Sequence, residues 1–382
     1  MFDGVLPAAC PVQSLVAAMR PDEPLHILHP TALRTAAAEF TTAFPGRTLY
    51  AVKCNPEPEV LRALWAGGVR EFDCASLPEI ALVRGLFPTA GIHFMHPIKS
   101  RSAIRDAHAL HGVRSFVLDS AAELAKIRTE TGNAPGLTLV VRLALPKGEA
   151  RLDLSGKFGA PVAEAAALLR AARPHAARLG LSFHVGSQCL DPAAWRHALA
   201  LAGDAIALAQ TPVDIIDVGG GFPAPYPGMT PPPLAVFMAA IRQGAAALPP
   251  AELWSEPGRA LVATGASLVV QVLARRGTDL FINDGTYGTL SDAGSPAFRY
   301  PTRLLRSSAA PTLPFRFLGP TCDSADTMPG PFHLPADIEE GDHIEITHLG
   351  AYGTTLRTTF NGFGTHTTVT LDTTPEPAAL AA

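Results

Sequence analysis

The sequence predicts an α/β protein made of a (β/α)8 TIM-type barrel and a second, mostly antiparallel β domain. Between residues 48 and 256, short apolar runs alternate with Ala- and Leu-rich helical stretches, and the apolar runs number eight. After residue 260 the helical periodicity largely disappears. Strands that alternate with helices indicate βαβ units in a parallel sheet, and eight such units can close a barrel. An open, doubly wound sheet is the alternative.

The eight apolar runs are the expected barrel strands. In chain order they are TLYAVK (48–53), REFDCAS (70–76), GIHFMH (91–96), RSFVLD (114–119), LTLVVRL (137–143), LSFHVG (181–186), VDIIDVG (213–219) and ELWSE (252–256). The stretches between them, such as residues 56–68 and 162–180, are expected helices. The first of these opens with proline and closes on a glycine pair, as helices commonly do.

The remaining residues are expected to form the β domain. Its strand-like runs are separated by Gly and Pro turns and read ASLVVQVLA (266–274), DLFIND (279–284), PFRFLG (314–319), DHIEITHLG (342–350) and THTTVTL (365–371). A short apolar run also precedes the barrel. We therefore expect the barrel over residues 29–264 and the β domain over residues 1–28 and 265–382.

Composition excludes several classes of protein. The chain has 382 residues, a formal net charge of −4 and no basic run, so a nucleic-acid partner is not expected. Its apolar stretches are broken by Arg or Pro, and the early Asp3 argues against a signal peptide, so we expect no membrane partner. The five cysteines are scattered without a C-x-x-C pair, which predicts no cysteine metal site and a reducing, cytoplasmic location.

Polar residues follow the expected barrel strands, and the C-terminal ends of barrel strands share one mouth. The chain has only five lysines, and Lys53 is the one at the end of an apolar strand. Lys126 reads as part of a solvated helix face, and Lys99, Lys147 and Lys157 lie in polar connections. Burial lowers the pKa of a lysine, and a neutral amine can form a Schiff base with a carbonyl. The alternative for Lys53 is an ammonium that extends to solvent.

Three further features complete a candidate site. The run Gly219, Gly220 and Gly221 follows the seventh strand, where barrels commonly bind phosphate, although a tight turn would need the same glycines. Arg259 adds a positive charge nearby in the sequence. Glu256 could pair with a heterocyclic nitrogen or form a salt bridge, and His184 could stack on a planar ligand or pack in the core. Together with Lys53, these residues predict a pyridoxal 5′-phosphate site.

The chain resembles the fold type III, alanine-racemase-like pyridoxal-phosphate decarboxylases, within the ornithine/lysine decarboxylase branch. The matching motifs occur in family order over nearly the whole chain: YAVKCN (50–55), FDCAS (72–76), KFG (157–159), HVGSQ (184–188), DVGGGFP (217–223), EPGR (256–259), NDGTYG (283–288), GPTCDSAD (319–326), GAYG (350–353) and FNGF (360–363).

This resemblance implies a role for each matching position. It implies that Lys53 binds the cofactor as a Schiff base, that Glu256 keeps the pyridine nitrogen protonated and that His184 stacks on the ring. Asp73 and Arg142 would support the Lys53 side of the ring. The residues implied to hold the phosphate are Ser187, Gly219, Gly220, Gly221, Gly258, Arg259 and Tyr352.

The resemblance also implies an obligatory homodimer with shared active sites. Cys322 and Asp323 of the β domain would reach the partner's site, where Cys322 donates a proton to Cα and Asp323, with Tyr352, binds the substrate. A buried, inert thiol is the alternative for Cys322. The implied reaction is decarboxylation of a basic amino acid, ornithine or lysine, to a diamine and CO2, because an aspartate after this cysteine suits a distal ammonium group.

Other activities stay open at this point. A second aspartate expected after NDGTYG is not evident, because Asp292 comes too early, and Arg299 and Arg303 follow it. Diaminopimelate and carboxynorspermidine are therefore alternative substrates, and an amino-acid racemase of the same fold is an alternative enzyme. The non-enzymatic alternatives are a pseudo-decarboxylase that binds a regulatory partner and a small cofactor carrier.

Overall fold

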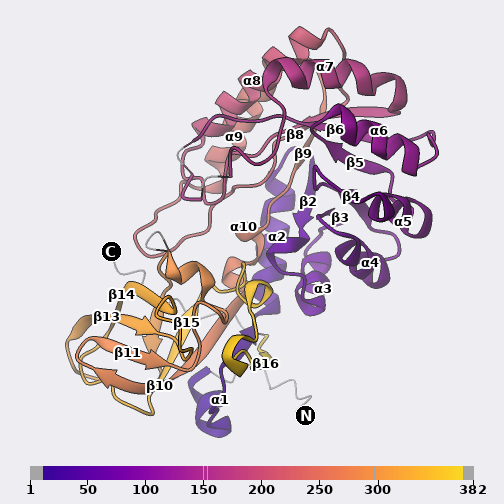
Figure 1. Ribbon diagram of the computed structural model, residues 1–382. Coiled ribbons are helices and arrows are strands. Elements are labelled where there is room, and N and C mark those ends of the chain that lie inside the picture. Colours follow the sequence, from indigo (N-terminus) through magenta and orange to yellow (C-terminus); the bar gives the residue numbers. More distant parts are fainter. Residues whose placement is uncertain (1–11, 149, 153, 296–297, 373–382) are drawn as a thin grey trace. The chain divides into compact units, whose positions relative to one another are not determined.

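Eight parallel strands close a barrel in the computed structural model, which describes residues 12–148, 150–152, 154–295 and 298–372 (Figure 1). The strands are β2 (Arg47–Ala51), β3 (Glu71–Cys74), β4 (Gly91–Phe94), β5 (Ser115–Leu118), β6 (Thr138–Arg142), β7 (Arg178–Ser182), β8 (Ile215–Asp217) and β9 (Glu252–Ser255). Because β9 pairs with β2 in parallel, the sheet has no free edge. The predicted barrel is confirmed, and the alternative of an open sheet is wrong.

Helix α2 precedes the first barrel strand, and a helix follows each of the eight strands, as the βα alternation predicted. They are α2 (Pro30–Ala43), α3 (Pro58–Ala66), α4 (Leu77–Leu86), α5 (Arg101–His111), α6 (Ala121–Glu130), α7 (Val162–Ala172), α8 (Ala193–Ala209), α9 (Leu234–Ala245) and the short α10 (Arg259–Val262). Local chemistry sets several of their ends. Ser76, Ser100 and Ser120 accept a backbone hydrogen bond at the starts of α4, α5 and α6.

The sixth strand lies earlier in the chain than the sequence analysis placed it. The expected helix over residues 162–180 ends at Ala172, and residues 178–182 form β7 in place of the expected strand over 181–186. Pro174 causes the early end, because proline cannot continue an α-helix and here lies in a 3-10 turn. His184 and Ser187 consequently lie beyond the strand, in the loop at the barrel mouth.

Charged residues from five strands form a network around the starts of the barrel strands. Glu252 on β9 accepts hydrogen bonds from Arg47 on β2 (2.6 Å), from Arg178 on β7 (2.5 Å) and from the Trp254 indole (3.2 Å). Arg47 also pairs with Glu71 on β3, which contacts His93 on β4. In barrels, polar networks at this end contribute to stability, whereas catalytic residues occupy the opposite end.

Replacing Glu252 with glutamine is expected to lower the free energy of unfolding by about 1 kcal/mol at pH 7. Burial opposes ionisation of Glu252, but the hydrogen bonds from Arg47 and Arg178 outweigh it and lower the pKa of Glu252. A carboxylate whose pKa is lowered by folding stabilises the protein above its unfolded pKa and loses this effect as the pH falls. The wild-type advantage in urea unfolding should therefore shrink below about pH 4.

The matched control for this prediction is Glu59→Gln. Glu59 forms an exposed pair with Arg62, in which both side chains are 55% exposed. Surface pairs of this kind contribute little, so the control should unfold like the wild type. An equal effect of the two substitutions would show that the network around Glu252 stabilises the fold no more than an exposed ion pair does.

The second unit is a mostly antiparallel sheet. Its strands are β1 (Leu25–Leu28), β10 (Ala266–Arg276), β11 (Asp279–Ile282), β12 (Thr302–Leu304), β13 (Thr312–Leu318), β14 (Thr327–Pro335), β15 (His343–Thr347) and β16 (Thr367–Thr370). The main order is β12-β15-β10-β11-β13-β14, and β1 pairs with β10 and β16. Helix α1 (Val12–Met19) shares an apolar cluster with Leu25 and Ile27 of β1.

Two strands of this sheet, β12 and β14, were not predicted from the sequence. β14 contains Pro329, Pro331 and Pro335, and prolines normally argue against a strand. It lies at the edge of the sheet, where a missing backbone N–H costs no ladder hydrogen bond. β12 has only three residues, so its pattern is too short to recognise.

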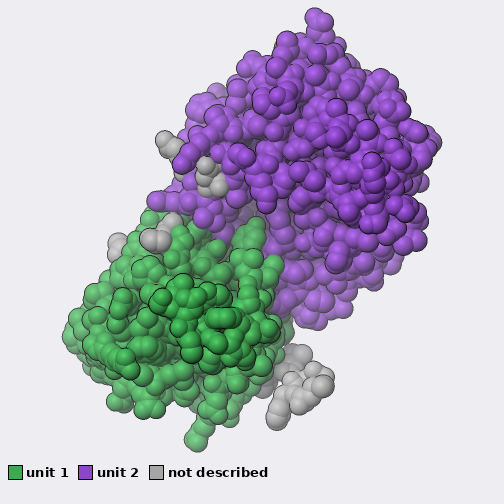
Figure 2. Space-filling view, viewed as in Figure 1, with its two compact units in different colours: residues 1–36, 224–230, 261–382 green, residues 37–223, 231–260 purple. Residues whose placement is uncertain are grey.

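The chain divides into two compact units (Figure 2). Unit 1 contains residues 1–36, 224–230 and 261–382, and unit 2, which holds the barrel strands, contains residues 37–223 and 231–260. Within the described residues, no helix has the length and apolar character needed to cross a membrane.

Candidate active site

Lys53 and Asp73 lie on neighbouring elements at the C-terminal ends of β2 and β3. Lys53 is in a 3-10 turn (Val52–Cys54) directly after β2, and its Nζ donates a hydrogen bond to Asp73 Oδ2 at 3.1 Å. The Asp73 side chain is 2% exposed, whereas that of Lys53 is 46% exposed. Lys53 is therefore only half-buried, and its amine is held beside the buried Asp73 carboxylate.

The buried lysine is Lys99, which the sequence analysis assigned to a polar connection. Its side chain is fully buried, and its Nζ contacts Glu123 Oε1 at 2.9 Å. The carbonyl oxygens of Val117 and His96 accept two more hydrogen bonds from it, at 2.6 and 3.0 Å. Lys126 pairs with the same carboxylate at 2.5 Å, so it is not on a solvated helix face. Periodicity gives no signal for the burial of Lys99, because Lys99 lies before α5 whereas Glu123 and Lys126 lie on α6.

The glycine run after β8 packs tightly against the loop after β7. Gly219 and Gly221 have φ values of +66° and +98°, in the region that favours glycine. A Cβ at Gly219 would lie 2.1 Å from the Phe183 carbonyl oxygen, and one at Gly221 would lie 2.4 Å from that of Gly186. A Cβ at Gly220 would lie 2.5 Å from the Glu256 carbonyl oxygen. Only glycine fits here, and the run brings the ends of β7, β8 and β9 together.

Glu256 and Asp217 form a buried pair of carboxyl groups at the ends of β9 and β8. Asp217 Oδ1 accepts the Gly219 N–H at 2.9 Å. Within the described residues, no N–H or O–H donor reaches Oε1 of Glu256, although this atom is buried. Burial, with Asp217 and Asp73 nearby, raises the pKa of Glu256 well above its usual range. A cationic N–H partner would remove this penalty, so the pocket suits a protonated heterocycle.

His184 lies beside the glycine run in its neutral form. Its Nδ1 accepts the Gly186 N–H at 3.0 Å, so the ring proton resides on Nε2. Burial, together with the charges of Arg142 and Lys53, lowers the pKa of His184 well below its usual range. A neutral imidazole in this position can stack on a planar ring.

The other predicted cofactor residues of unit 2 follow the strands in the same way. Arg142 ends β6, and Ser187 pairs its backbone with Leu152 in the loop after β7. Gly258 lies against Cys54, where a Cβ would be 3.0 Å from the cysteine Cβ, and the buried Arg259 begins α10. Unit 2 thus brings together all the barrel residues that the sequence analysis selected at one end of the strands.

Unit 1 holds the predicted substrate residues. Cys322 is exposed, and the next residue, Asp323, accepts a hydrogen bond from the Tyr287 hydroxyl at 2.5 Å. That bond, with one from the Ala325 backbone, lowers the pKa of Asp323 and keeps it ionised. Tyr352 has a left-handed φ of +56° in the segment after β15. The sequence analysis gave Tyr287 no role, although it belongs to the quoted motif NDGTYG.

The three residues that left the choice of substrate open, Asp292, Arg299 and Arg303, all belong to unit 1. Arg303 pairs with the buried Glu345 of β15 at 2.7 Å, so its charge is compensated within unit 1. Asp292 lies in a 3-10 turn (Ser291–Gly294), and the Arg299 guanidinium lies close to Gly228.

Comparison with known proteins identifies the family. Residues 31–263 match the family model described as "Pyridoxal-dependent decarboxylase, pyridoxal binding domain". The chain belongs to the pyridoxal-dependent decarboxylases.

Characterised decarboxylases resemble the chain over most of its length. A lysine/ornithine decarboxylase of Selenomonas ruminantium is 35% identical over 343 residues, which cover 86% of this chain and 84% of the relative. An arginine decarboxylase of Paramecium bursaria Chlorella virus, solved with agmatine, superposes with a TM-score of 0.83 at 29% identity, covering 94% of this chain and 99% of the other. A lysine/ornithine decarboxylase of Vibrio vulnificus, complexed with putrescine, has a TM-score of 0.81 at 30% identity over 94% and 97% of the two chains.

The barrel of this decarboxylase fits pyridoxal 5′-phosphate, the cofactor of the family. Glu256 offers a buried carboxyl oxygen that lacks a donor among the described residues, as a pyridine N–H requires. The glycine run, in which each added Cβ would collide with a backbone oxygen, lies beside His184 and the Glu256 backbone, and successive glycines of this kind suit phosphate binding. His184 offers a neutral ring, and Lys53 offers an amine beside the Asp73 carboxylate. Lys53, His184, the glycine run and Glu256 all belong to unit 2, whereas Tyr352 belongs to unit 1.

Proposed function

We propose that this decarboxylase removes the α-carboxylate of ornithine or lysine and releases a diamine and CO2. The observation that carries this proposal is the ionised Asp323, which Tyr287 holds at 2.5 Å directly after Cys322. A fixed carboxylate favours a substrate with a distal ammonium group. The lysine/ornithine decarboxylases among the relatives support the same substrate class.

The barrel residues would hold the cofactor and control its charge. Lys53 would bind it covalently, while Asp73 keeps the lysine side chain directed toward the site. Glu256 would pair with the ring nitrogen, His184 and Arg142 would contact the ring, and the phosphate would be bound by Ser187, Gly219, Gly220, Gly221, Gly258, Arg259 and Tyr352. The chemistry that bound pyridoxal phosphate would supply is an electron sink for decarboxylation at Cα. Glu256 would support this withdrawal by stabilising the protonated nitrogen.

Cys322 would return the proton to Cα. Its thiol is exposed in this chain, so it is accessible to a substrate. We propose that residues 1–28 and 265–382 form a β domain that supplies Cys322 and Asp323 to the active site of a partner subunit in a homodimer. The exposed apolar side chains of Leu356, Phe360 and Phe363 on the same unit support a subunit interface there. A cytoplasmic location stays a prediction from the scattered cysteines.

The test is CO2 release from the cofactor-loaded protein with both enantiomers of ornithine, lysine, arginine and diaminopimelate, and with carboxynorspermidine. The highest kcat/KM is expected for ornithine or lysine. Turnover of diaminopimelate or carboxynorspermidine alone would contradict the substrate proposal. Chiral analysis of the recovered amino acid distinguishes a racemase, and cofactor binding without any turnover would favour a non-enzymatic role.

A matched variant tests the role of Asp323 directly. Asp323→Asn keeps the shape of the side chain but removes its charge. It should raise KM for ornithine and lysine by about tenfold or more, because a charge-assisted hydrogen bond to the substrate is lost. An unchanged KM would show that another group binds the distal ammonium.

A further inference from the structure

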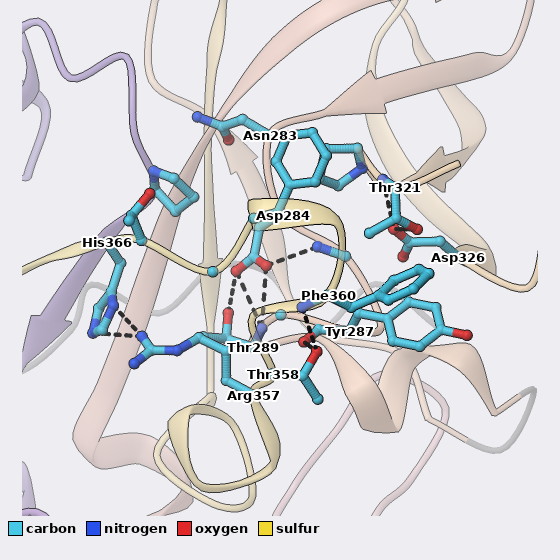
Figure 3. Close-up of a pocket in the computed structure, with 17 residues that line it drawn as sticks. Asn283, Asp284, Tyr287, Thr289, Thr321, Asp326, Arg357, Thr358, Phe360 and His366 are labelled. Atoms are coloured by element: carbon cyan, nitrogen blue, oxygen red, sulfur yellow. Dashed lines mark hydrogen bonds between the residues drawn. The ribbon is translucent and has the colours of Figure 1, made fainter. Parts of the chain in front are cut away.

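The loop that carries Cys322 is anchored at its far end by a buried carboxylate. The loop joins β13 to β14 and closes on Asp326, which accepts hydrogen bonds from the backbone and hydroxyl of Thr286 at 2.7 and 3.0 Å. Thr321 donates two more, at 3.1 and 2.8 Å (Figure 3). Cys322 lies between these fixed points but is itself exposed. Packing alone therefore does little to orient its thiol.

A side chain from a distant loop, that of Asn361, holds the backbone of Cys322. The Cys322 N–H donates a hydrogen bond to Asn361 Oδ1 at 3.0 Å, across 39 residues of sequence. Asn361 has a left-handed backbone, with φ +57° and ψ 14°. Asparagine is one of the few residues with a side chain that adopts this conformation readily. The position thus combines a backbone shape that most residues avoid with a side-chain oxygen that accepts the cysteine amide.

The loop that carries Asn361 is fixed by its own contacts. Thr358 donates its backbone N–H and its hydroxyl to the Tyr287 carbonyl oxygen, at 2.8 and 3.1 Å. The Phe360 ring lies 4.9 Å from the Tyr287 ring, and the Arg357 guanidinium contacts the His366 ring (Figure 3). These contacts fix Asn361 as an acceptor. Tyr287 also connects the Asn361 loop to Asp323, because the Tyr287 hydroxyl donates a hydrogen bond to the Asp323 carboxylate.

We propose that Asn361 is a positioning residue that orients the Cys322 thiol for proton transfer to the substrate. This inference rests on the proposed function. After CO2 leaves, the electron pair on Cα takes the proton of the Cys322 thiol, so that a C–H bond forms and the S–H bond breaks. The thiolate then recovers a proton from water. Because Asn361 holds the cysteine backbone while Tyr287 holds Asp323, proton transfer and substrate binding depend on separate hydrogen bonds.

The first test measures hydrogen exchange in the full-length protein without cofactor. Asn361→Gly removes the acceptor but keeps a residue that tolerates positive φ, whereas Asn361→Asp keeps both the acceptor and that tolerance. In peptides covering residues 319–326, one amide of Asn361→Gly should exchange roughly fivefold faster than in the wild type, as loss of one hydrogen bond implies. Asn361→Asp should match the wild type. Equal exchange in all three proteins would overturn the proposed hydrogen bond.

The second test measures kcat and KM on the cofactor-loaded protein. Asn361→Gly should lower kcat by roughly 10- to 100-fold, because misplaced proton donors lose most of their effect, with KM changed less than about twofold. The kcat of Asn361→Asp should match that of the wild type. An unchanged kcat in Asn361→Gly, or a change in KM alone, would overturn the positioning role. An inactive wild type would instead refute the proposed function, and the exchange result would still decide whether Asn361 holds Cys322.

Discussion

Replacing Lys53 with alanine is expected to lower the decarboxylation rate by about 1000-fold or more and to remove the visible absorption band of the covalently held cofactor. Lys53 lies in the turn after β2, at the barrel mouth. Its Nζ lies 3.1 Å from the Oδ2 atom of Asp73, which is on β3. A nucleophilic amine held in place contributes rate enhancement that free cofactor in solution lacks. The measurements are CO2 release and the absorption spectrum of the dialysed protein.

The control for this prediction is Lys147→Ala, because Lys147 is an exposed lysine in the loop after β6. That variant should keep the absorption band. Borohydride reduction followed by peptide mapping identifies the modified lysine independently of activity, and the label should appear on the peptide that contains Lys53. A label on Lys99 would refute the assignment.

Replacing Glu123 with glutamine is expected to lower the free energy of unfolding by about 3 kcal/mol at pH 7, since it leaves a buried ammonium without its counter-ion. The Lys99 side chain is fully buried, and Glu123 contacts both Lys99 and Lys126. The backbone oxygens of Val117 and His96 would still accept hydrogen bonds from Lys99, but they carry no full charge. Chemical unfolding of the two proteins measures the difference.

The pH dependence of this difference gives a specific signature. Burial lowers the pKa of Lys99 to about 8, although Glu123 acts in the opposite direction. Without Glu123 the folded-state pKa should fall further, while the unfolded chain keeps its proton up to about pH 10. Where the unfolded state binds more protons, stability rises with pH. As the pH rises from about 6 to about 8, the free energy of unfolding of the variant should therefore rise relative to that of the wild type. The difference in stability between the two proteins should shrink over that range.

Two further variants separate charge from packing. Glu130→Gln lies on the same helix, but its partners Arg101 and Arg105 are largely exposed, so it should unfold like the wild type. The double variant Lys99→Met/Glu123→Leu removes both charges and should recover most of the stability. A double variant as unstable as Glu123→Gln would mean that shape, rather than an uncompensated charge, causes the loss.

Local sequence patterns predicted much of the fold and part of the site. The alternation of apolar runs with helical stretches was sufficient for all eight barrel strands, because each pattern lies within a single element. The same reasoning extended the helix that begins at residue 162 to residue 180, although Pro174 was a visible signal for its end at Ala172. β14 was missed because only its edge position makes its three prolines acceptable.

In the candidate site, too, local sequence patterns predicted some features and missed others. Lys53, Glu256 and the Gly219–Gly221 run could be selected because each lies at the end of a recognisable strand, and parallel strands in a barrel share one mouth. The half-exposure of Lys53 was left open and the burial of Lys99 was missed, because burial depends on which elements pack around a side chain. Asp217 was quoted within a motif without a role, and only the fold places its carboxyl beside that of Glu256.

The sequence by itself determined the order of strands and helices, the barrel class and the chemical types of residue at the barrel mouth. These depend on short-range periodicity and on residues such as glycine and proline, whose backbone preferences act locally. Only the tertiary structure decided which charges are buried together and which loops hold Cys322 and Asp323. Those contacts join residues that are 24 to 39 positions apart, such as Lys99 with Glu123 and Cys322 with Asn361. Such pairings leave no periodic trace in the sequence, because they depend on how separate elements pack.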